Sequence, residues 1–222
     1  MIITIDGYAG SGKSSAARGL ADALGFTLLN TGAMYRAAGL ALQDAGYDIY
    51  ADPPDLARIA QLVAPYTFDM NGDKTVLCGV DFTPRLQSPG AGAAASRVGL
   101  FPPVRARLKA EQRRIADGRD MICEGCDQGT AVFPDAAVKF FFTASVEVRA
   151  WRRFSERAKA DDSADLGMIA RRIAERDRQD ETRPIDPLKK ADDAVVIDTS
   201  DAPLESILEL MKKVVAECRA RA

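Results

Sequence analysis

The stretch GYAGSGKS, Gly7 to Ser14, matches the pattern G-x-x-x-x-G-K-[S/T] at every position. It directly follows Ile2 to Ile5, a short β-branched run that is typical of a buried strand. It opens an amphipathic pattern from Lys13 to Leu24, which Gly25 ends. A strand, a glycine-rich turn and a helix in this order are the context in which the pattern forms a phosphate-binding loop. We therefore predict a nucleoside triphosphate site near the start of the chain.

The chemistry of such a loop explains its residue types. Glycines let the backbone approach phosphate oxygens and point N–H groups at them, and the following helix presents its positive end. The Lys13 ammonium can reach the terminal phosphates, and the Ser14 hydroxyl can bind magnesium. We expect the triphosphate to contact Gly7, Tyr8, Ala9, Gly10, Ser11, Gly12, Lys13, Ser14 and Ser15.

The rest of the chain alternates short apolar runs with longer helical patterns. This alternation predicts an α/β fold with a parallel sheet flanked by helices. The predicted strands cover residues 2–5, 26–29, 121–123, 138–142 and 194–197, and the predicted helices cover residues 13–24, 31–45, 103–116, 146–159, 163–180 and 204–220.

One segment breaks the alternation. Residues 66–83 show the pattern of a β-hairpin around Asn71-Gly72, flanked by helical patterns. We predict a small insert at about residues 60–95. The polar run from Glu156 to Gly167 predicts a connection between two helices.

Composition limits the classes of function. The chain has 222 residues, of which 47% are hydrophobic, and a formal net charge of −2. No bulk positive charge exists to attract nucleic acid or a membrane surface, so we expect neither as a partner. No apolar run approaches the roughly 18 residues that span a bilayer, and the start MIITIDG lacks the features of a secretion signal. We expect a cytoplasmic protein.

The four cysteines are Cys78, Cys123, Cys126 and Cys218. Cys123 and Cys126 have C-x-x-C spacing, which occurs in zinc and redox sites. A zinc site needs four ligands, and the chain has no histidine and no second close cysteine pair. In an extended segment their Cα atoms would lie roughly 10 Å apart, too far for a disulfide. We expect neither a metal nor a disulfide here.

Five blocks occur in one order along nearly the whole chain and resemble the cytidylate kinase (CMP/dCMP kinase) family of P-loop nucleoside monophosphate kinases. They are IDGYAGSGKSS, LLNTGAMYRAAGLAL, AAASRVGLFPPVRARLKAEQRR, EGCDQGTAVFPDAAVKFFFTAS and ERDRQDETRPIDPLKKADDAVVIDTS. The resemblance implies one P-loop kinase domain over residues 1–222, with a five-stranded parallel sheet, a nucleoside-monophosphate-binding insert and a short lid at about residues 152–167. It further implies a monomer that transfers a phosphoryl group from ATP to CMP or dCMP with Mg²⁺.

The resemblance also assigns residues. On the acceptor side it implies Thr31, Tyr35, Arg36, Ser96, Arg105, Asp127, Arg176, Asp180 and Arg183. The residues expected to act on the transferred group are Lys13, Asp127, Arg152, Arg176 and Arg183, and Arg149, Arg152, Arg153 and Arg157 resemble the lid that closes over the donor. The spacing of Arg176, Asp180 and Arg183 predicts that all three share one helix face. Asp6 is not among the candidates, because an acid at a strand end is often a turn residue.

One position departs from the pattern of the family. Cys126 stands where the family usually has arginine, within EGCDQGT. The loss of that contact leaves three alternatives: weakened acceptor binding, compensation by Arg97 or Arg85, or an acceptor pocket retuned for another small molecule. A fourth alternative, of a different class, is a nucleotide-binding regulator without transfer activity.

Overall fold

The structure, a computed structural model, describes residues 1–71, 74–88, 90–158 and 165–221. It contains two compact units. We call Met1–Leu28 together with Asp120–Ala222 the loop unit, because it holds the predicted phosphate loop. We call Leu29–Arg119 the inserted unit, and each is described by itself.

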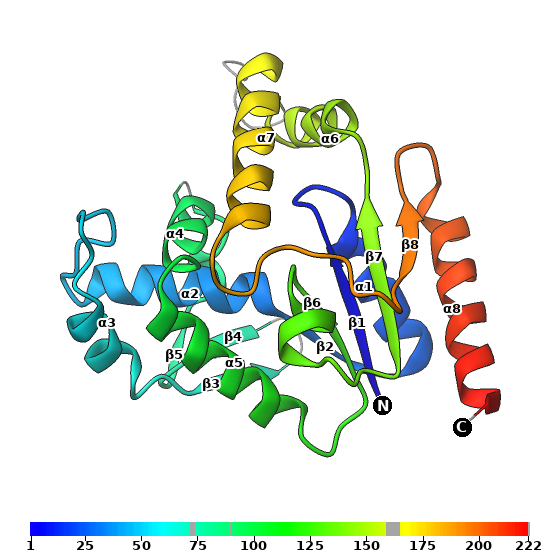
Figure 1. Cartoon of the computed structure of the whole chain (residues 1–222), viewed down its shortest axis with the longest axis horizontal. Coiled ribbons are helices and arrows are strands. Elements are labelled where there is room, and N and C mark those ends of the chain that lie inside the picture. The colour runs from blue at the N-terminus through cyan, green and yellow to red at the C-terminus, as the bar shows by residue number, and fades with distance from the viewer. Residues whose placement is uncertain (72–73, 89, 159–164, 222) are drawn as a thin grey trace. The chain divides into compact units, whose positions relative to one another are not determined.

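The main sheet has five strands in the order β2-β6-β1-β7-β8 (Figure 1). β1 runs parallel to β6 and to β7, and β7 runs parallel to β8. The predicted five-stranded parallel sheet is therefore confirmed, with the strand that precedes the loop at its centre. The strands are β1 (Ile2–Gly7), β2 (Thr27–Asn30), β6 (Met121–Glu124), β7 (Val138–Thr143) and β8 (Val195–Asp198).

The core of the loop unit lies between this sheet and two helices. α1 presents Ala17, Leu20 and Ala21 to β1, and α8 presents Ile207 and Met211 to the same cluster. These positions recur at helical spacing, which is why the sequence predicts both helices. The helices of this unit are α1 (Lys13–Leu24), α6 (Val146–Ala158), α7 (Leu166–Thr182) and α8 (Leu204–Arg221), with a short π-helical turn, η2, at Gln128–Val132.

The start of α7 differs from the prediction. α7 was expected from residue 163 but begins at Leu166, because the Asp165 side chain accepts hydrogen bonds from the backbone N–H groups of Gly167 and Met168. A side-chain cap of this kind fixes a helix start. Residues 159–164 of the predicted lid lie outside the described residues.

The inserted unit consists of helices and a three-stranded sheet. Its helices are α2 (Thr31–Asp44), α3 (Leu56–Val63), α4 (Ala91–Val98) and α5 (Pro102–Ala116), with a 3₁₀ turn, η1, at Thr83–Arg85. The hairpin of β3 (Phe68–Asn71) and β4 (Lys74–Leu77) is antiparallel and is extended by β5 (Val80–Asp81). Residues 72–73 of the predicted turn lie outside the described residues.

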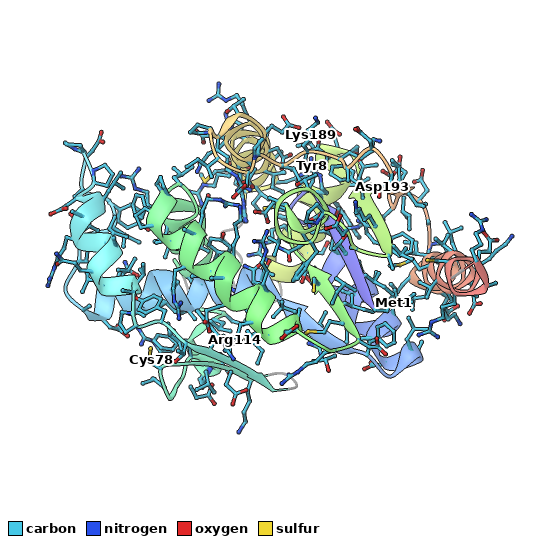
Figure 2. The ribbon with its side chains drawn as sticks, turned by 60° about the horizontal axis from the view of Figure 1, so that its bottom comes forward. Met1, Tyr8, Cys78, Arg114, Lys189 and Asp193 are labelled. Carbon is cyan, nitrogen blue, oxygen red and sulfur yellow. The ribbon has the colours of Figure 1, made fainter. Side chains whose placement is uncertain are left out.

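This unit is wider than the expected insert of residues 60–95, because α2 and α5 pack into it. Buried Glu111 on α5 accepts a hydrogen bond from the backbone N–H of Phe68 at 2.8 Å and pairs with Arg107 and Arg114. Arg114, labelled in Figure 2, donates to the Phe68 carbonyl. These contacts bind α5 to β3, which a sequence pattern does not show.

No helix within the described parts of the chain has both the length and the apolar character needed to cross a membrane.

Candidate phosphate-binding and acceptor site

The predicted phosphate loop connects β1 to α1. Gly7 has a φ of 139°, and a Cβ atom there would lie 2.0 Å from the Phe142 carbonyl oxygen of β7, so only glycine fits. Gly12 has a φ of 85° and begins α1 without a side-chain cap. The first N–H groups of α1 are therefore available to an anion at the positive end of the helix.

Lys13 lies inside the loop. Its ammonium donates a hydrogen bond to the Tyr8 carbonyl at 2.7 Å, and the side chain is buried. Burial lowers the pKa of Lys13, because it disfavours the charged form, while the acidic groups Glu124 and Asp6 partly oppose this change. An incoming phosphate would restore a full counter-charge at this ammonium.

Glu124 lies next to the predicted magnesium ligand. The Ser14 hydroxyl donates to a Glu124 carboxylate oxygen at 2.9 Å. Glu124 ends β6, which pairs with β1 in register Ile5↔Glu124. Parallel strands bring their carboxyl ends to one edge of the sheet, so an acid at the end of a neighbouring strand was the signal that could have revealed Glu124.

Asp6 also belongs to the site, although its place at a strand end predicted only a turn residue. Its carboxylate accepts hydrogen bonds from the backbone N–H groups of Gln128 at 2.8 Å and Gly129 at 2.7 Å. Burial raises the pKa of Asp6 to about 7, against the opposing effect of these two bonds. Asp6 thus fixes the turn after β6 to the strand that precedes the phosphate loop.

Thr199, which follows β8, reaches the loop from the other side. Its hydroxyl donates to the Ser11 carbonyl at 2.8 Å. Arg152 of α6 donates to the Thr199 hydroxyl at 3.1 Å and to its carbonyl at 2.5 Å. Arg152 is therefore connected to the loop through Thr199. Ser15 lies exposed on the first turn of α1.

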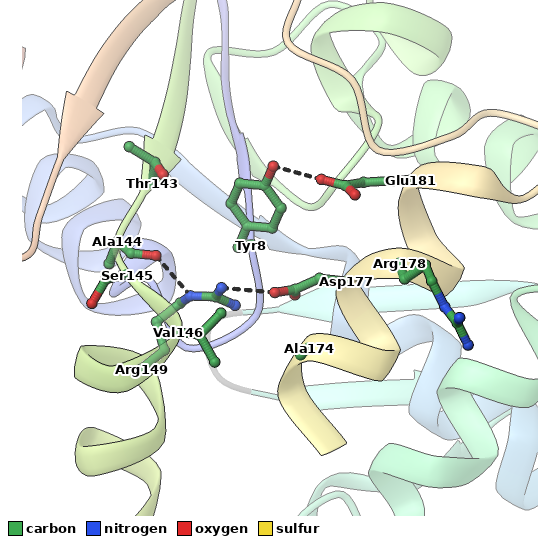
Figure 3. A pocket seen from close by; sticks show the side chains of 10 residues that line it. All are labelled: Tyr8, Thr143, Ala144, Ser145, Val146, Arg149, Ala174, Asp177, Arg178 and Glu181. Carbon is green, nitrogen blue, oxygen red and sulfur yellow. Dashed lines mark hydrogen bonds and ion pairs between the residues drawn. The ribbon is translucent and has the colours of Figure 1, made fainter. Parts of the chain in front are cut away.

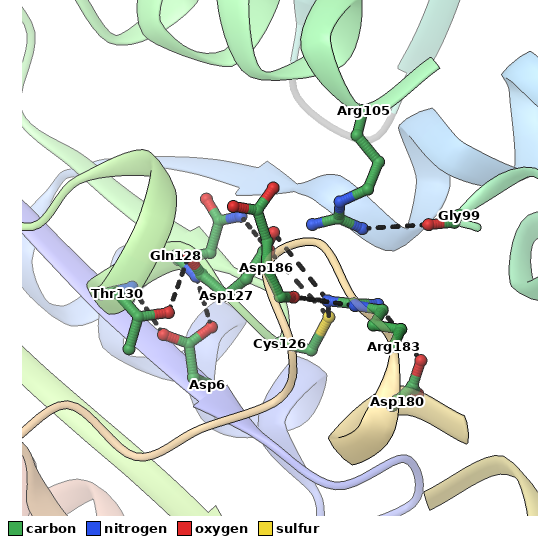
Figure 4. A network of polar contacts seen from close by, with 11 residues as sticks. Asp6, Gly99, Arg105, Cys126, Asp127, Gln128, Thr130, Asp180, Arg183 and Asp186 are labelled. Atoms are coloured by element: carbon green, nitrogen blue, oxygen red, sulfur yellow. Dashed lines mark hydrogen bonds and ion pairs between the residues drawn. The ribbon is translucent and has the colours of Figure 1, made fainter. Parts of the chain in front are cut away.

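A second cluster forms around Arg183, at the end of α7 (Figure 4). Its guanidinium donates to the Asp180 carboxylate at 3.2 Å and to the Asp186 carbonyl, and lies 4.0 Å from the Asp127 carboxylate. It also contacts the Cys126 sulfur at 3.2 Å. We call Cys126, Asp127, Asp180 and Arg183 the Arg183 cluster.

The prediction that Arg176, Asp180 and Arg183 share one helix face is wrong for Arg183. α7 ends at Thr182, and Arg183 is the extended residue that follows it. Arg183 therefore turns back to meet Asp180 on the last turn, while Arg176 meets Asp180 along the helix at 3.6 Å. The three charges are still brought together, by the end of the helix and not by its periodicity.

The remaining acceptor candidates lie in the inserted unit. Thr31, Tyr35 and Arg36 occupy the first turns of α2, which starts where the Asn30 side chain accepts from the Ala33 N–H. The buried Arg105 of α5 donates to the Gly99 carbonyl at 3.3 Å and lies 5.7 Å from the Tyr35 ring centroid. Ser96 is half-buried on α4, which packs against α2.

The two arginines suggested as replacements have other partners. Arg97 donates to the carbonyls of Ile49 and Ala51, at 2.8 and 2.9 Å. Arg85 is paired with Asp44 at 2.5 Å. Both guanidinium groups are thus engaged by other groups of the inserted unit.

The predicted lid arginine Arg149 has a different position from the one expected. It is buried, forms an ion pair with Asp177 of α7 at 2.7 Å and donates to the carbonyl of Ala144 (Figure 3). It also donates to the carbonyl of Ala9 in the phosphate loop at 3.3 Å. Such an arginine joins α6, α7 and the phosphate loop and is not free to close over a donor. The side chain of Arg157 lies outside the described residues.

The cysteines form no bridge. All four are free, Cys123 is buried in β6, and no group of three or more metal-ligating side chains occurs among the residues that the structure describes. Burial raises the pKa of Cys126 to about 12, so this thiol is neutral.

The family model for cytidylate kinase matches residues 3–217. The chain is 44% identical over 211 residues to the cytidylate kinase of Pelotomaculum thermopropionicum, with 94% of this chain and 93% of the relative covered. It is 41% identical over 219 residues to the cytidylate kinase of Mycobacterium avium, covering 98% of this chain and 96% of that relative.

Among solved structures, an uncharacterized protein from Eubacterium ventriosum ATCC 27560 aligns with a TM-score of 0.54 at 12% identity, over 97% of this chain and 98% of that one. This likeness concerns the fold alone. The family match and the two relatives together show that the chain belongs to the cytidylate kinase family.

Proposed function

We propose that the protein transfers the terminal phosphoryl group of ATP to the phosphate of CMP or dCMP, with Mg²⁺, and releases ADP and CDP or dCDP. One observation carries the proposal. Asp6, which directly precedes the phosphate loop, accepts hydrogen bonds from the backbone N–H groups of Gln128 and Gly129, which directly follow Asp127. Donor-side and acceptor-side groups thus share one edge of the loop unit.

The donor side is built from the loop. Its N–H groups and Lys13 bind the phosphates of ATP, and Lys13 neutralises negative charge that spreads over the transferred group. Arg152 and Thr199 hold the Ser11 segment beside them. No covalent enzyme intermediate is needed, because the transfer depends on positioning and charge stabilisation.

Magnesium fits the oxygen donors present. Mg²⁺ usually binds through one or two protein oxygens, substrate phosphates and several waters. The Ser14 hydroxyl would hold the ion. The Glu124 carboxylate lies 2.9 Å from this hydroxyl oxygen. When bound, the ion neutralises phosphate charge and orients the terminal phosphate. Because the Ser14 hydroxyl donates its hydrogen to Glu124, its oxygen lone pairs would be left for the ion.

The acceptor side has two parts. In the loop unit, Asp127 orients the acceptor, Arg176 and Arg183 bind its phosphate, and Asp180 holds both arginines. In the inserted unit, Thr31, Tyr35 and Arg36 hold the monophosphate, and the resemblance assigns Ser96 and Arg105 to cytosine, with Asp127 of the loop unit as the carboxylate of the same set. A hydroxyl, a guanidinium and a carboxylate supply the donors and acceptors that the base requires.

A coupled assay for ADP with CMP, dCMP, UMP, AMP and shikimate as acceptors tests the proposal, with Lys13→Ala as the inactive control. We expect the highest kcat/KM for CMP or dCMP. A higher value for another acceptor would favour the retuned kinase. ATP binding without product from any acceptor would favour the regulator.

We also propose a monomer in a reducing compartment such as the cytoplasm. Four free cysteines in the described structure are consistent with reducing conditions. Sedimentation at micromolar concentration tests the monomer.

A further inference from the structure

Tyr8 connects the phosphate loop to the last turn of α7. Its hydroxyl donates a hydrogen bond to the Glu181 carboxylate at 2.7 Å across an open hollow of about 390 Å³ (Figure 3). The hydrogen bond to Glu181 is the main cause that raises the pKa of Tyr8 to about 12. Tyr8 therefore stays protonated, and able to donate, at physiological pH.

A second connection between the same elements is of a different kind. The Arg149–Asp177 ion pair lies one turn earlier on α7 than Glu181 and is buried, with side-chain exposures of 3% and 11%. The Arg149 guanidinium also lies 5.0 Å from the centroid of the Tyr8 ring. Breaking a buried charge pair is costly, whereas an exposed hydrogen bond breaks and forms at little cost. The buried Arg149–Asp177 pair therefore holds α6 to α7, whereas the exposed Tyr8–Glu181 hydrogen bond can break and re-form.

Glu181 lies between the acceptor-side residues Asp180 and Arg183, at the end of α7. It follows Asp180 directly and precedes Arg183 by two residues, on the turn where Arg183 folds back onto Asp180. A bond from Tyr8 to this turn therefore joins the loop that binds the donor to the residues that bind the acceptor.

We propose that Tyr8 and Glu181 form a latch that makes donor and acceptor binding cooperative. The inference rests on the proposed function for the identity of the two ligands. Tyr8 and Glu181 are positioning residues: a donor that fixes Tyr8 orders the end of α7, and an acceptor bound by Arg183 orders the loop. Coupling of this kind is reciprocal.

The test measures a coupling factor, the ratio of the Kd of a non-hydrolysable ATP analogue without CMP to that with CMP. Tyr8→Phe keeps the ring and its contact with Arg149 but removes the hydroxyl. We expect it to lower the coupling factor about two- to tenfold, as for loss of one exposed hydrogen bond. Glu181→Ala should do the same, and the double variant should lose no more than either alone. Glu181→Gln keeps a carbonyl acceptor and should restore most of the coupling.

Tyr50→Phe and Glu209→Ala are matched controls, because both side chains are exposed and lie outside the latch. A wild-type coupling factor of one, an unchanged factor in Tyr8→Phe, or additive losses in the double variant would each overturn the latch.

Hydrogen exchange separates this result from the proposed function, because it needs no acceptor. The analogue alone should slow exchange at the last turn of α7 in the wild type, and less so in Tyr8→Phe. If CMP proves not to be an acceptor, the proposed function fails, and equal protection in both proteins would still overturn the latch.

Discussion

The phosphate loop and the Arg183 cluster are built in different ways. In the loop the decisive contacts are local: Lys13 binds the carbonyl of Tyr8, and Gly12 begins the helix that carries Lys13. In the cluster, Arg183 reaches Cys126, which is 57 residues away in the chain. A motif can specify the first arrangement, because its geometry is set by neighbouring residues. The second depends on where a strand and a helix end, and is therefore more open to substitution.

The largest effect is expected from the loop. Lys13→Ala should abolish transfer, because the loss of one charge-assisted phosphate contact of roughly 1.5–3 kcal/mol already implies about tenfold or more. Removing a buried ammonium should leave the fold intact. Steady-state kinetics and thermal unfolding check this. Retention of more than about a tenth of wild-type turnover would contradict it.

Substitutions in the Arg183 cluster should impair use of the acceptor and not binding of ATP. Arg183→Met and Asp180→Ala should lower kcat/KM for CMP by about ten- to a hundredfold, because a buried guanidinium and its carboxylate partner are lost. Binding of an ATP analogue should change much less. Equal losses on both sides would mean that this end of α7 is structural or belongs to the lid.

The sequence predicted the sheet and the loop because both follow from local patterns. Ile2 to Ile5 form a continuous β-branched run, Lys13 to Leu24 repeat at the period of a helix, and the structure has both elements there. Arg149 could not be assigned in this way. An arginine on a polar helix face is equally compatible with a lid and with a buried ion pair, and only the position of Asp177 decides between them. The same holds for Arg97, whose carbonyl partners lie 46 and 48 residues away.

Cys126 offers a sharper test of the cluster. A neutral thiol is a weak acceptor as well as a weak donor, so the hydrogen bond that its sulfur accepts from Arg183 contributes little, and Cys126→Ala should change acceptor efficiency less than about threefold. Cys126→Arg adds a guanidinium and should raise kcat/KM for CMP by about tenfold, as a charge-assisted contact to phosphate would. Arg97→Ala is the control: it should lower stability through the Ile49 and Ala51 carbonyls and leave acceptor efficiency unchanged.

If Cys126→Arg has little effect and Arg97→Ala is strongly harmful to acceptor use, compensation through Arg97 is correct after all. If Cys126→Arg destroys activity on another acceptor, the substrate assignment is wrong.

The smallest effect, a change in the free energy of unfolding with pH, is expected from Asp6. This residue directly precedes the phosphate loop but contacts Gln128 and Gly129, which are distant in the sequence. Its pKa is about 7 in the folded chain and roughly 4 when unfolded. Between these values the native state holds more protons than the unfolded state, so the stability contributed by Asp6 falls as pH rises. Raising the pH from 6 to 7 should lower the free energy of unfolding by about 1 kcal/mol through this group.

Urea unfolding at the two pH values measures this change. Asp6→Asn, which cannot ionise, should lose that part of the pH dependence while keeping the slope with urea. An equal dependence in both proteins would show that the two backbone N–H groups outweigh burial and hold Asp6 ionised. In that case Asp6, like Lys13, carries a constant charge at the phosphate loop. The long-range contacts of the site would then begin at Asp6, at the end of β1.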